Sequence, residues 1–194
     1  DDSGWGGILW RVPSLTTRLR DKSFLSLFGG AGALAAELAK EGMDALLIDT
    51  AHSPQNNLAN ARVARTIDGI LPLFDLLGID LPCCTWSRAR RAPRLSPFPS
   101  ALRSNQFIMG LPDLPERDRS TLALHNKLYR LAIRWAKGSL CAGKSGYIEN
   151  PATSMLWKSK GVRRLLKLGA YFLALDMCQY GRQFKKATKL LVWG

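Results

Sequence analysis

The stretch 23-SFLSLFGGAGALAAELAKEGMDALLIDT-50 decides the fold, because it holds a strand, a turn, a helix and a second strand in succession. Residues 23–28 form a short apolar run that stops at two glycines, as a buried strand does. The segment 31–42 carries leucines at helical spacing and ends on a glycine, which is typical of a helix C-terminus. Residues 44–50 form a second apolar run. This order predicts two parallel strands joined by a helix.

The rest of the chain continues the alternation of strands and helices. The predicted elements are a helix over 58–78 kinked at Pro72, a strand over 79–84, a long loop over 88–115, a basic amphipathic helix over 118–138, a strand over 146–150, a helix over 159–169 and strands over 171–178 and 188–193. The last two strands have no helix between them, so we expect an antiparallel hairpin. The prediction is an α/β fold with a mostly parallel, doubly wound sheet, formed by residues 23–194 after an N-terminal extension at 1–22.

The chain is strongly basic. It has 28 Lys and Arg against 15 Asp and Glu, a formal net charge of +13. Such an excess, with arginines clustered after residue 87, favours a polyanionic partner, nucleic acid ahead of an anionic membrane surface. No apolar run approaches the roughly 20 residues that a membrane helix needs, so we expect no membrane partner.

The four cysteines have neither a C-x-x-C spacing nor a Cys/His cluster, so we expect no metal site. Free thiols favour a reducing, intracellular compartment. The nucleus and an organelle such as the mitochondrion are both compatible with this composition.

A glycine turn followed by an acidic residue predicts a cofactor site. The turn 28-FGGAG-32 opens a helix, and Asp49 ends the next strand. Glycines let the backbone approach a ligand closely, and a carboxylate at the end of the second strand can accept both ribose hydroxyls of a nucleoside. The turn lacks the G-x-G-x-x-G pattern, and no P-loop occurs, so S-adenosylmethionine fits better than NAD. The alternative is a glycine-rich connection with Asp49 as a helix cap.

Two more motifs are expected at the same edge of the sheet. In 80-DLPCCTWSRARRAPR-94, Cys83 follows a strand and has arginines nearby, which would stabilise a nucleophilic thiolate. In 147-YIENPATSMLW-157, Glu149 ends a strand and could protonate or hydrogen-bond a base. The alternatives are cysteines that serve as small core residues and a carboxyl that caps a helix.

The order of these motifs resembles the cytosine-5 methyltransferases. The signatures of that family are F-x-G-x-G, an acidic residue one strand later, P-C-Q-x-F-S and E-N-V, and 180-YGRQFKKATKL-190 looks like its Y-G-x-P-Q-x-R-x-R segment. A divergent subgroup, P-C-x-T-[FW]-S-R-A-R with E-N-P-x-x-S-x-L-W, is similar to 82-PCCTWSRAR-90 and 149-ENPATSMLW-157. The subgroup's L-R-S-x-x-x-x-x-G-L-P is similar to 102-LRSNQFIMGLP-112. The resemblance implies a Rossmann-like methyltransferase fold.

The same resemblance implies roles for individual residues. Cys83 would add to C6 of a cytosine, Glu149 would hold the ring at N3, and C5 would take the methyl group of S-adenosylmethionine. The cofactor would be held by Phe28, Gly29, Gly30, Gly32, Asp49 and Asn57, and the phosphates of DNA, favoured over RNA, by Arg88, Arg90, Arg91, Arg94, Arg103, Lys185 and Lys186.

The sequence also departs from the family pattern. Leu81 and Cys84 replace residues of P-P-C-Q, and no target-recognition segment follows the last motif. A second hypothesis is therefore a catalytically inactive methyltransferase-fold protein. It would be a basic, RNA-binding structural subunit of a ribonucleoprotein such as an organellar ribosome, with other proteins as partners.

Overall fold

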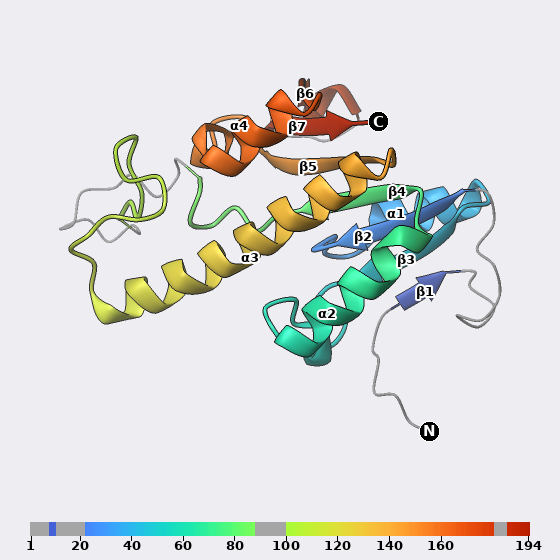
Figure 1. The fold of residues 1–194 in the computed structure, drawn as a ribbon, viewed down its shortest axis with the longest axis horizontal. Helices are drawn as coiled ribbons and strands as arrows, with labels where there is room; N and C mark the ends of the chain where they lie inside the picture. The colour runs from blue at the N-terminus through green and yellow to red at the C-terminus, as the bar shows by residue number, and fades with distance from the viewer. Residues whose placement is uncertain (1–7, 11–21, 88–99, 181–185) are drawn as a thin grey trace.

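A seven-stranded sheet forms the centre of the part of the chain that the structure describes (Figure 1). The computed structural model describes residues 8–10, 22–87, 100–180 and 186–194. The strands are β1 (Ile8–Trp10), β2 (Ser23–Leu27), β3 (Asp44–Ile48), β4 (Leu76–Asp80), β5 (Ser145–Pro151), β6 (Tyr171–Asp176) and β7 (Ala187–Trp193). Their order is β1-β3-β2-β4-β5-β7-β6.

The centre of the sheet is parallel and its ends are antiparallel. β2 pairs in parallel with β3 and β4, and β4 pairs in parallel with β5. β7 lies between β5 and β6 and is antiparallel to both. The predicted α/β class, with a mostly parallel sheet and an antiparallel C-terminal hairpin, is confirmed. β1 is a strand that the sequence did not predict, and it pairs antiparallel with β3.

Helices cover both faces of the sheet. They are α1 (Ala33–Lys40), α2 (Ala61–Ile70), α3 (Glu116–Cys141) and α4 (Lys160–Lys167), with short 3-10 helices η1 (Pro54–Asn56), η2 (Leu71–Leu73), η4 (Met155–Lys158) and η5 (Met177–Tyr180). α1 packs its alanines against Phe24 on one face. α2, α3 and α4 pack on the other face, which Leu25 and Leu27 of the same strand present because side chains alternate along β2. No helix among the described residues is long and apolar enough to cross a membrane.

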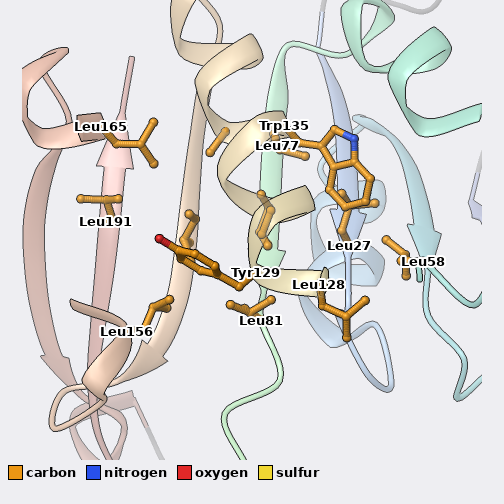
Figure 2. Packing of buried hydrophobic residues seen from close by; sticks show 14 of the residues in the cluster. Leu27, Leu58, Leu77, Leu81, Leu128, Tyr129, Trp135, Leu156, Leu165 and Leu191 are labelled. Atoms are coloured by element: carbon orange, nitrogen blue, oxygen red, sulfur yellow. The ribbon is translucent and has the colours of Figure 1, made fainter. Parts of the chain in front are cut away.

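The larger core lies between the sheet and α2, α3 and α4. Leu77 and Leu191 from the strands meet Tyr129 and Trp135 from α3 (Figure 2). Burial of each such side chain contributes about 1.5–3 kcal/mol to folding. Trp135 also donates a hydrogen bond from Nε1 to Asp68 Oδ1 at 2.8 Å, which ties α3 to α2. The core therefore fixes α3, the longest helix described, against the centre of the sheet.

The predicted helix over 58–78 is interrupted near Pro72 as expected, but its extension beyond residue 73 is wrong. α2 ends at Ile70, Pro72 lies in η2, and β4 begins at Leu76 rather than at residue 79. Proline lacks the N–H that would continue the helix, and the apolar residues after it pair with β2 instead. The strand consequently ends at Asp80, so the segment up to Cys83 has already left the sheet.

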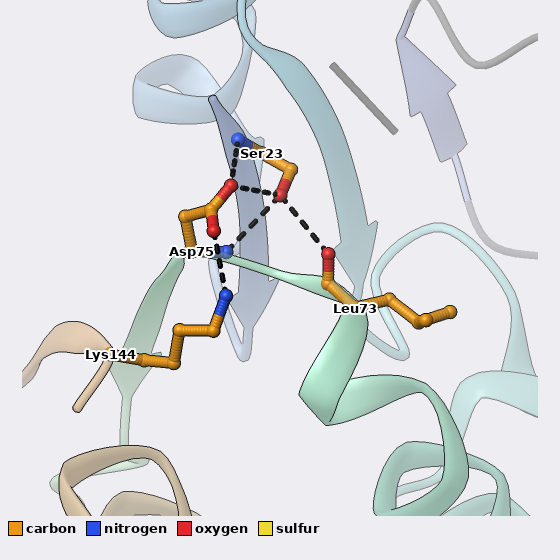
Figure 3. Close-up of polar contacts among 4 residues, drawn as sticks. All are labelled: Ser23, Leu73, Asp75 and Lys144. Atoms are coloured by element: carbon orange, nitrogen blue, oxygen red, sulfur yellow. Dashed lines mark hydrogen bonds and ion pairs between the residues drawn. The ribbon is translucent and has the colours of Figure 1, made fainter. Parts of the chain in front are cut away.

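A polar cluster joins the amino ends of the central strands (Figure 3). Ser23 donates to Asp75 Oδ2 from its backbone N–H at 3.2 Å and from its hydroxyl at 2.9 Å. Lys144 Nζ lies 2.8 Å from Asp75 Oδ1. Burial alone would raise the pKa of Asp75, but the hydrogen bonds from Lys144 and Ser23 outweigh it and lower the pKa. This ionised cluster links the amino ends of β2, β4 and β5, at the end of the sheet opposite the predicted motifs.

Candidate functional site

The predicted motifs lie at the carboxyl ends of four adjacent parallel strands. The glycine turn follows β2, Asp49 follows β3, Cys83 follows β4 by three residues, and Glu149 lies near the end of β5. Asp80 and Glu149 are direct partners in the register of β4 and β5. Open α/β sheets bind ligands at this edge. The topology therefore brings together residues that are up to 121 positions apart in the chain, from Phe28 to Glu149.

The glycine turn has the backbone conformation that its residues predict. Gly30 and Gly32 have positive φ angles of 56° and 75°, which glycine adopts without strain. Phe28 also has a positive φ, 60°, a conformation that is uncommon outside glycine and often marks a functional turn. A Cβ at Gly29 would collide with the hydroxyl of Ser26. The turn is thus tight against β2, and α1 begins directly after it.

Asp49 is bonded to the glycine turn itself. Its Oδ2 accepts from the N–H of Gly30 at 2.9 Å, and its Oδ1 accepts from the N–H of Ala51 at 2.7 Å. His52 Nε2 lies 2.6 Å from the carbonyl oxygen of Gly30. Each carboxylate oxygen can accept a second hydrogen bond, so the residue retains acceptor capacity for a hydroxyl. Asn57 is exposed, and its Oδ1 accepts from the N–H of Ala59 at 3.0 Å.

The two adjacent cysteines differ in their surroundings. Both side chains are exposed, and they form a turn in which the N–H groups of Trp86 and Ser87 donate to the carbonyl oxygen of Cys83 at 2.9 and 2.8 Å. Cys84 Sγ lies 3.2 Å from Nε2 of His125 on α3. An imidazole at this distance can accept the thiol proton. The family pattern selects Cys83 as the nucleophile, whereas the thiol with a neighbouring base is Cys84.

We expect Cys84 to react with iodoacetamide faster than Cys83, because His125 can take up its proton as sulfur displaces iodide. Replacing His125 with glutamine is expected to slow alkylation of Cys84 roughly tenfold and to leave Cys83 unchanged. The rates would be measured by mass spectrometry of peptides from the folded protein, with the Cys84→Ser variant as a control for assignment. Equal rates at the two thiols, or no effect of the histidine substitution, would contradict the expectation.

An acidic cluster lies beside the cysteines. Burial, and to a smaller extent the charge of Glu149, raise the pKa of Asp80 to about 7, although Lys186 offsets part of the increase. Burial also raises the pKa of Tyr147, whose hydroxyl hydrogen-bonds to Asp80. Lys186 Nζ lies 3.4 Å from Glu149 Oε1. A carboxyl that titrates near neutral pH can donate or accept a proton in a reaction.

Asn150, the residue after Glu149, holds the cysteine segment in place. It is fully buried, and its Nδ2 donates to the carbonyl oxygen of Leu81 at 2.7 Å. This bond crosses from β5 to the backbone two residues before Cys83. The pair Glu149-Asn150 therefore provides one carboxyl at the edge and one amide that positions the neighbouring turn.

Arg103 is a correction to the predicted phosphate-binding residues. It is only 5% exposed, and its guanidinium lies 3.4 Å from the ring centroid of Trp86. It donates to Thr85 O at 3.1 Å, Thr85 Oγ1 at 3.0 Å, Ile108 O at 2.8 Å and Asn126 Oδ1 at 2.9 Å. These four bonds commit the guanidinium to acceptors inside the protein, which favours a structural role over phosphate binding. Lys186 is exposed, and Arg88, Arg90, Arg91, Arg94 and Lys185 lie outside the described residues.

No family model matches the sequence, and no curated protein matches it significantly. Among solved structures, the chain is similar to the crystal structure of S. pombe Dnmt2 methyltransferase, with a TM-score of 0.48 and 16% sequence identity. The similarity covers 89% of this chain and 50% of that chain, so this chain spans half the length of the other.

Sequence reasoning missed four residues at this edge. Asp80 and Tyr147 were read as parts of strands, although Asp80 directly precedes the cysteine motif. His52 and His125 are the two histidines of the chain, and both contact a predicted motif. The available signal was the residue type itself, because histidine is the side chain that most readily exchanges protons near neutral pH. With two histidines in the chain, each could have been considered as a candidate. Among the described residues, no group of three metal-ligating side chains occurs.

Proposed function

We propose that the chain is an S-adenosylmethionine-dependent methyltransferase that acts on cytosine in nucleic acid, with DNA favoured over RNA. The observation that carries the proposal is the juxtaposition of a thiol and a carboxyl on adjacent strand ends, Cys83 after β4 and Glu149 on β5, at the edge that also holds the glycine turn and Asp49. These residue types are what nucleophilic attack on a pyrimidine ring requires.

Each residue has a defined task in this reaction. The Cys83 thiolate adds to C6 while Glu149 hydrogen-bonds N3, which moves electron density to C5. C5 would take the methyl group as the S–CH3 bond of S-adenosylmethionine breaks and S-adenosylhomocysteine leaves. Water would then remove the proton from C5 as the thiolate departs from C6, which restores the aromatic ring. Asp80, with a pKa of about 7, can exchange a proton with Glu149 or solvent at this edge.

The glycine turn fits the cofactor that supplies the methyl group. Phe28, Gly29, Gly30, Gly32, Asp49 and Asn57 would hold it. Gly30 and Gly32 have no Cβ atoms, so a ligand can approach their backbone closely at the start of α1, and the carboxylate of Asp49 keeps acceptor capacity for a ribose.

The test combines binding and transfer. We expect calorimetry to detect S-adenosylmethionine binding, and a labelled methyl group to pass to cytosine-rich DNA or RNA. Cys83→Ser should abolish transfer without abolishing cofactor binding, while the matched variant Cys84→Ser keeps transfer. Absence of cofactor binding would overturn the proposal. If transfer survives in Cys83→Ser but not in Cys84→Ser, the nucleophile is Cys84.

A second candidate function is a non-catalytic, RNA-binding subunit of a ribonucleoprotein. The bonds of Gly30 to Asp49 and to His52 favour it, because they engage polar groups of the predicted cofactor site within the protein. Under this function the chain binds RNA, fails to bind S-adenosylmethionine, and purifies within a large RNA-containing particle together with other proteins. Fractionation of the native particle on a density gradient tests this alternative.

A further inference from the structure

A groove lies between α3, α4 and the segment 105–110. It has a volume of about 630 Å³. α3 and α4 form its floor. They approach closely because residue 161 is glycine, where a Cβ would collide with the hydroxyl of Tyr129. The N–H of Gly161 donates to that hydroxyl at 2.9 Å. A smaller hollow of about 350 Å³ continues the groove and shares Ile133, Gly161 and Arg164 with it.

The groove and its continuation are lined by cations without any acidic residue. The seven cationic residues are Arg130, Lys137, Lys158, Lys160, Arg163, Arg164 and Lys167. All seven are exposed, and none forms an ion pair with a residue that the structure describes. Like charges gathered this closely repel one another, so the arrangement favours an anionic partner that runs along the groove.

Apolar side chains interrupt the cationic lining. Phe107 is 40% exposed and Met109 is 39% exposed, and both line the groove. Exposed aromatic rings among cations are what single-stranded nucleic acid uses, since bases stack on the ring while phosphates meet the charges. Paired bases in a duplex are already stacked and cannot use such a ring. An anionic lipid surface would need a broad convex face rather than a groove.

We propose that this groove binds a single-stranded polynucleotide, with phosphates along the cations of α4 and a base stacked on Phe107. The proposal rests on the nucleic-acid partner of the proposed function, and it requires neither S-adenosylmethionine nor Cys83. It places the partner's backbone on the face that α3 and α4 cover, where residues Arg163 and Arg164 lie, in addition to the edge that carries the cysteines (Figure 1).

The test is equilibrium binding of fluorescent single strands of about 12 nucleotides, oligo(U) and oligo(dT), and of a matched duplex. The variant Lys160→Gln/Arg163→Gln/Arg164→Gln should weaken single-strand binding roughly 50-fold at ~0.15 M salt and reduce the slope of log affinity against log salt by about 2. Phe107→Ala should weaken binding about 5- to 150-fold and leave the salt slope unchanged. Comparing the two oligonucleotides tells RNA from DNA.

The matched control removes the same charge elsewhere. Lys40→Gln/Arg62→Gln/Arg65→Gln changes three exposed cations on α1 and α2, and we expect a much smaller loss of affinity. Thermal unfolding of each variant establishes that it is folded. Equal losses in the groove and control variants, duplex binding as tight as single-strand binding, or no binding at all would overturn the proposal. Measuring the Cys83→Ser variant without S-adenosylmethionine keeps this result separate from the fate of the methyltransferase proposal.

Discussion

Replacing Asp80 with asparagine is expected to stabilise the protein by about 2–4 kcal/mol at pH 8 and to change its stability little at pH 4. The cause is the raised pKa of Asp80, about 7 in the fold against an ordinary value of 3.8. Asparagine keeps the shape of the side chain and an oxygen that can accept from Tyr147, but it carries no charge to bury.

The sign of the pH dependence follows from where the proton resides. Between about pH 4 and pH 7 the folded protein keeps the proton on Asp80, while the unfolded chain has lost it. The free energy of unfolding of the native sequence therefore falls as pH rises through this window, by about 1.4 kcal/mol for each unit of difference between the two pKa values. The asparagine variant lacks this contribution. Urea denaturation of both proteins from pH 4 to pH 8 measures the divergence.

Two neighbouring variants test the stated cause. Glu149→Gln removes a charge that raises the pKa of Asp80, so the fall in stability should be smaller and end at a lower pH. Tyr147→Phe removes a hydrogen bond that lowers this pKa, so the fall should move to higher pH. Parallel stability curves for the native protein and Asp80→Asn would contradict the assignment. A carboxyl kept at a cost to stability, next to Glu149 at the carboxyl edge of the sheet, is typical of a functional site.

The elements that sequence analysis located correctly are those with strong periodicity. Examples are β2, β3 and α3, which correspond to the predicted strands at 23–28 and 44–50 and the predicted helix at 118–138. Their hydrophobic patterns can be recognised in the sequence without knowledge of tertiary contacts. Their alternation fixes the carboxyl edge, which is why the predicted motifs meet there. The predicted ends of elements were wrong where pairing with a distant strand determines them. Leu76 belongs to β4 because it pairs with β2, and the local sequence after Pro72 could not reveal that pairing.

The roles of charged residues were harder to predict than the fold. The sequence predicted a helix over 159–169 without a role for its cations, and the contact of α4 with α3 and the segment 105–110 makes them one wall of a groove. Arg103 had the opposite outcome, because three of its four acceptor atoms belong to residues 18 and 23 positions away in the chain. Contacts of that range are determined by packing and not by local sequence.

Arg103→Met is expected to destabilise the protein by about 3–5 kcal/mol, because several buried acceptors lose their donor at once. Thr85 O, Ile108 O and Asn126 Oδ1 all accept from this guanidinium, and methionine offers them nothing. The planar guanidinium also covers the ring of Trp86, and its loss removes a desolvated cation–π contact. Urea denaturation measures the change, with Arg119→Met as the control. Arg119 is an exposed cation paired with Glu116, and its loss should change stability by less than about 1 kcal/mol.

Lysine at position 103 separates charge from geometry. An ammonium retains the positive charge, but it cannot match the fork that reaches Thr85, Ile108 and Asn126 together, so we expect a loss intermediate between the native protein and Arg103→Met. Burial lowers the pKa of Arg103 to about 10, which still leaves the guanidinium charged at neutral pH. If Arg103→Met were as stable as the native protein but bound nucleic acid less tightly, the side chain would be a phosphate ligand as the sequence first indicated. If stability falls as expected, the role of Arg103 is structural, because its hydrogen bonds hold the segment 100–111 against the turn that contains Cys83 and Cys84.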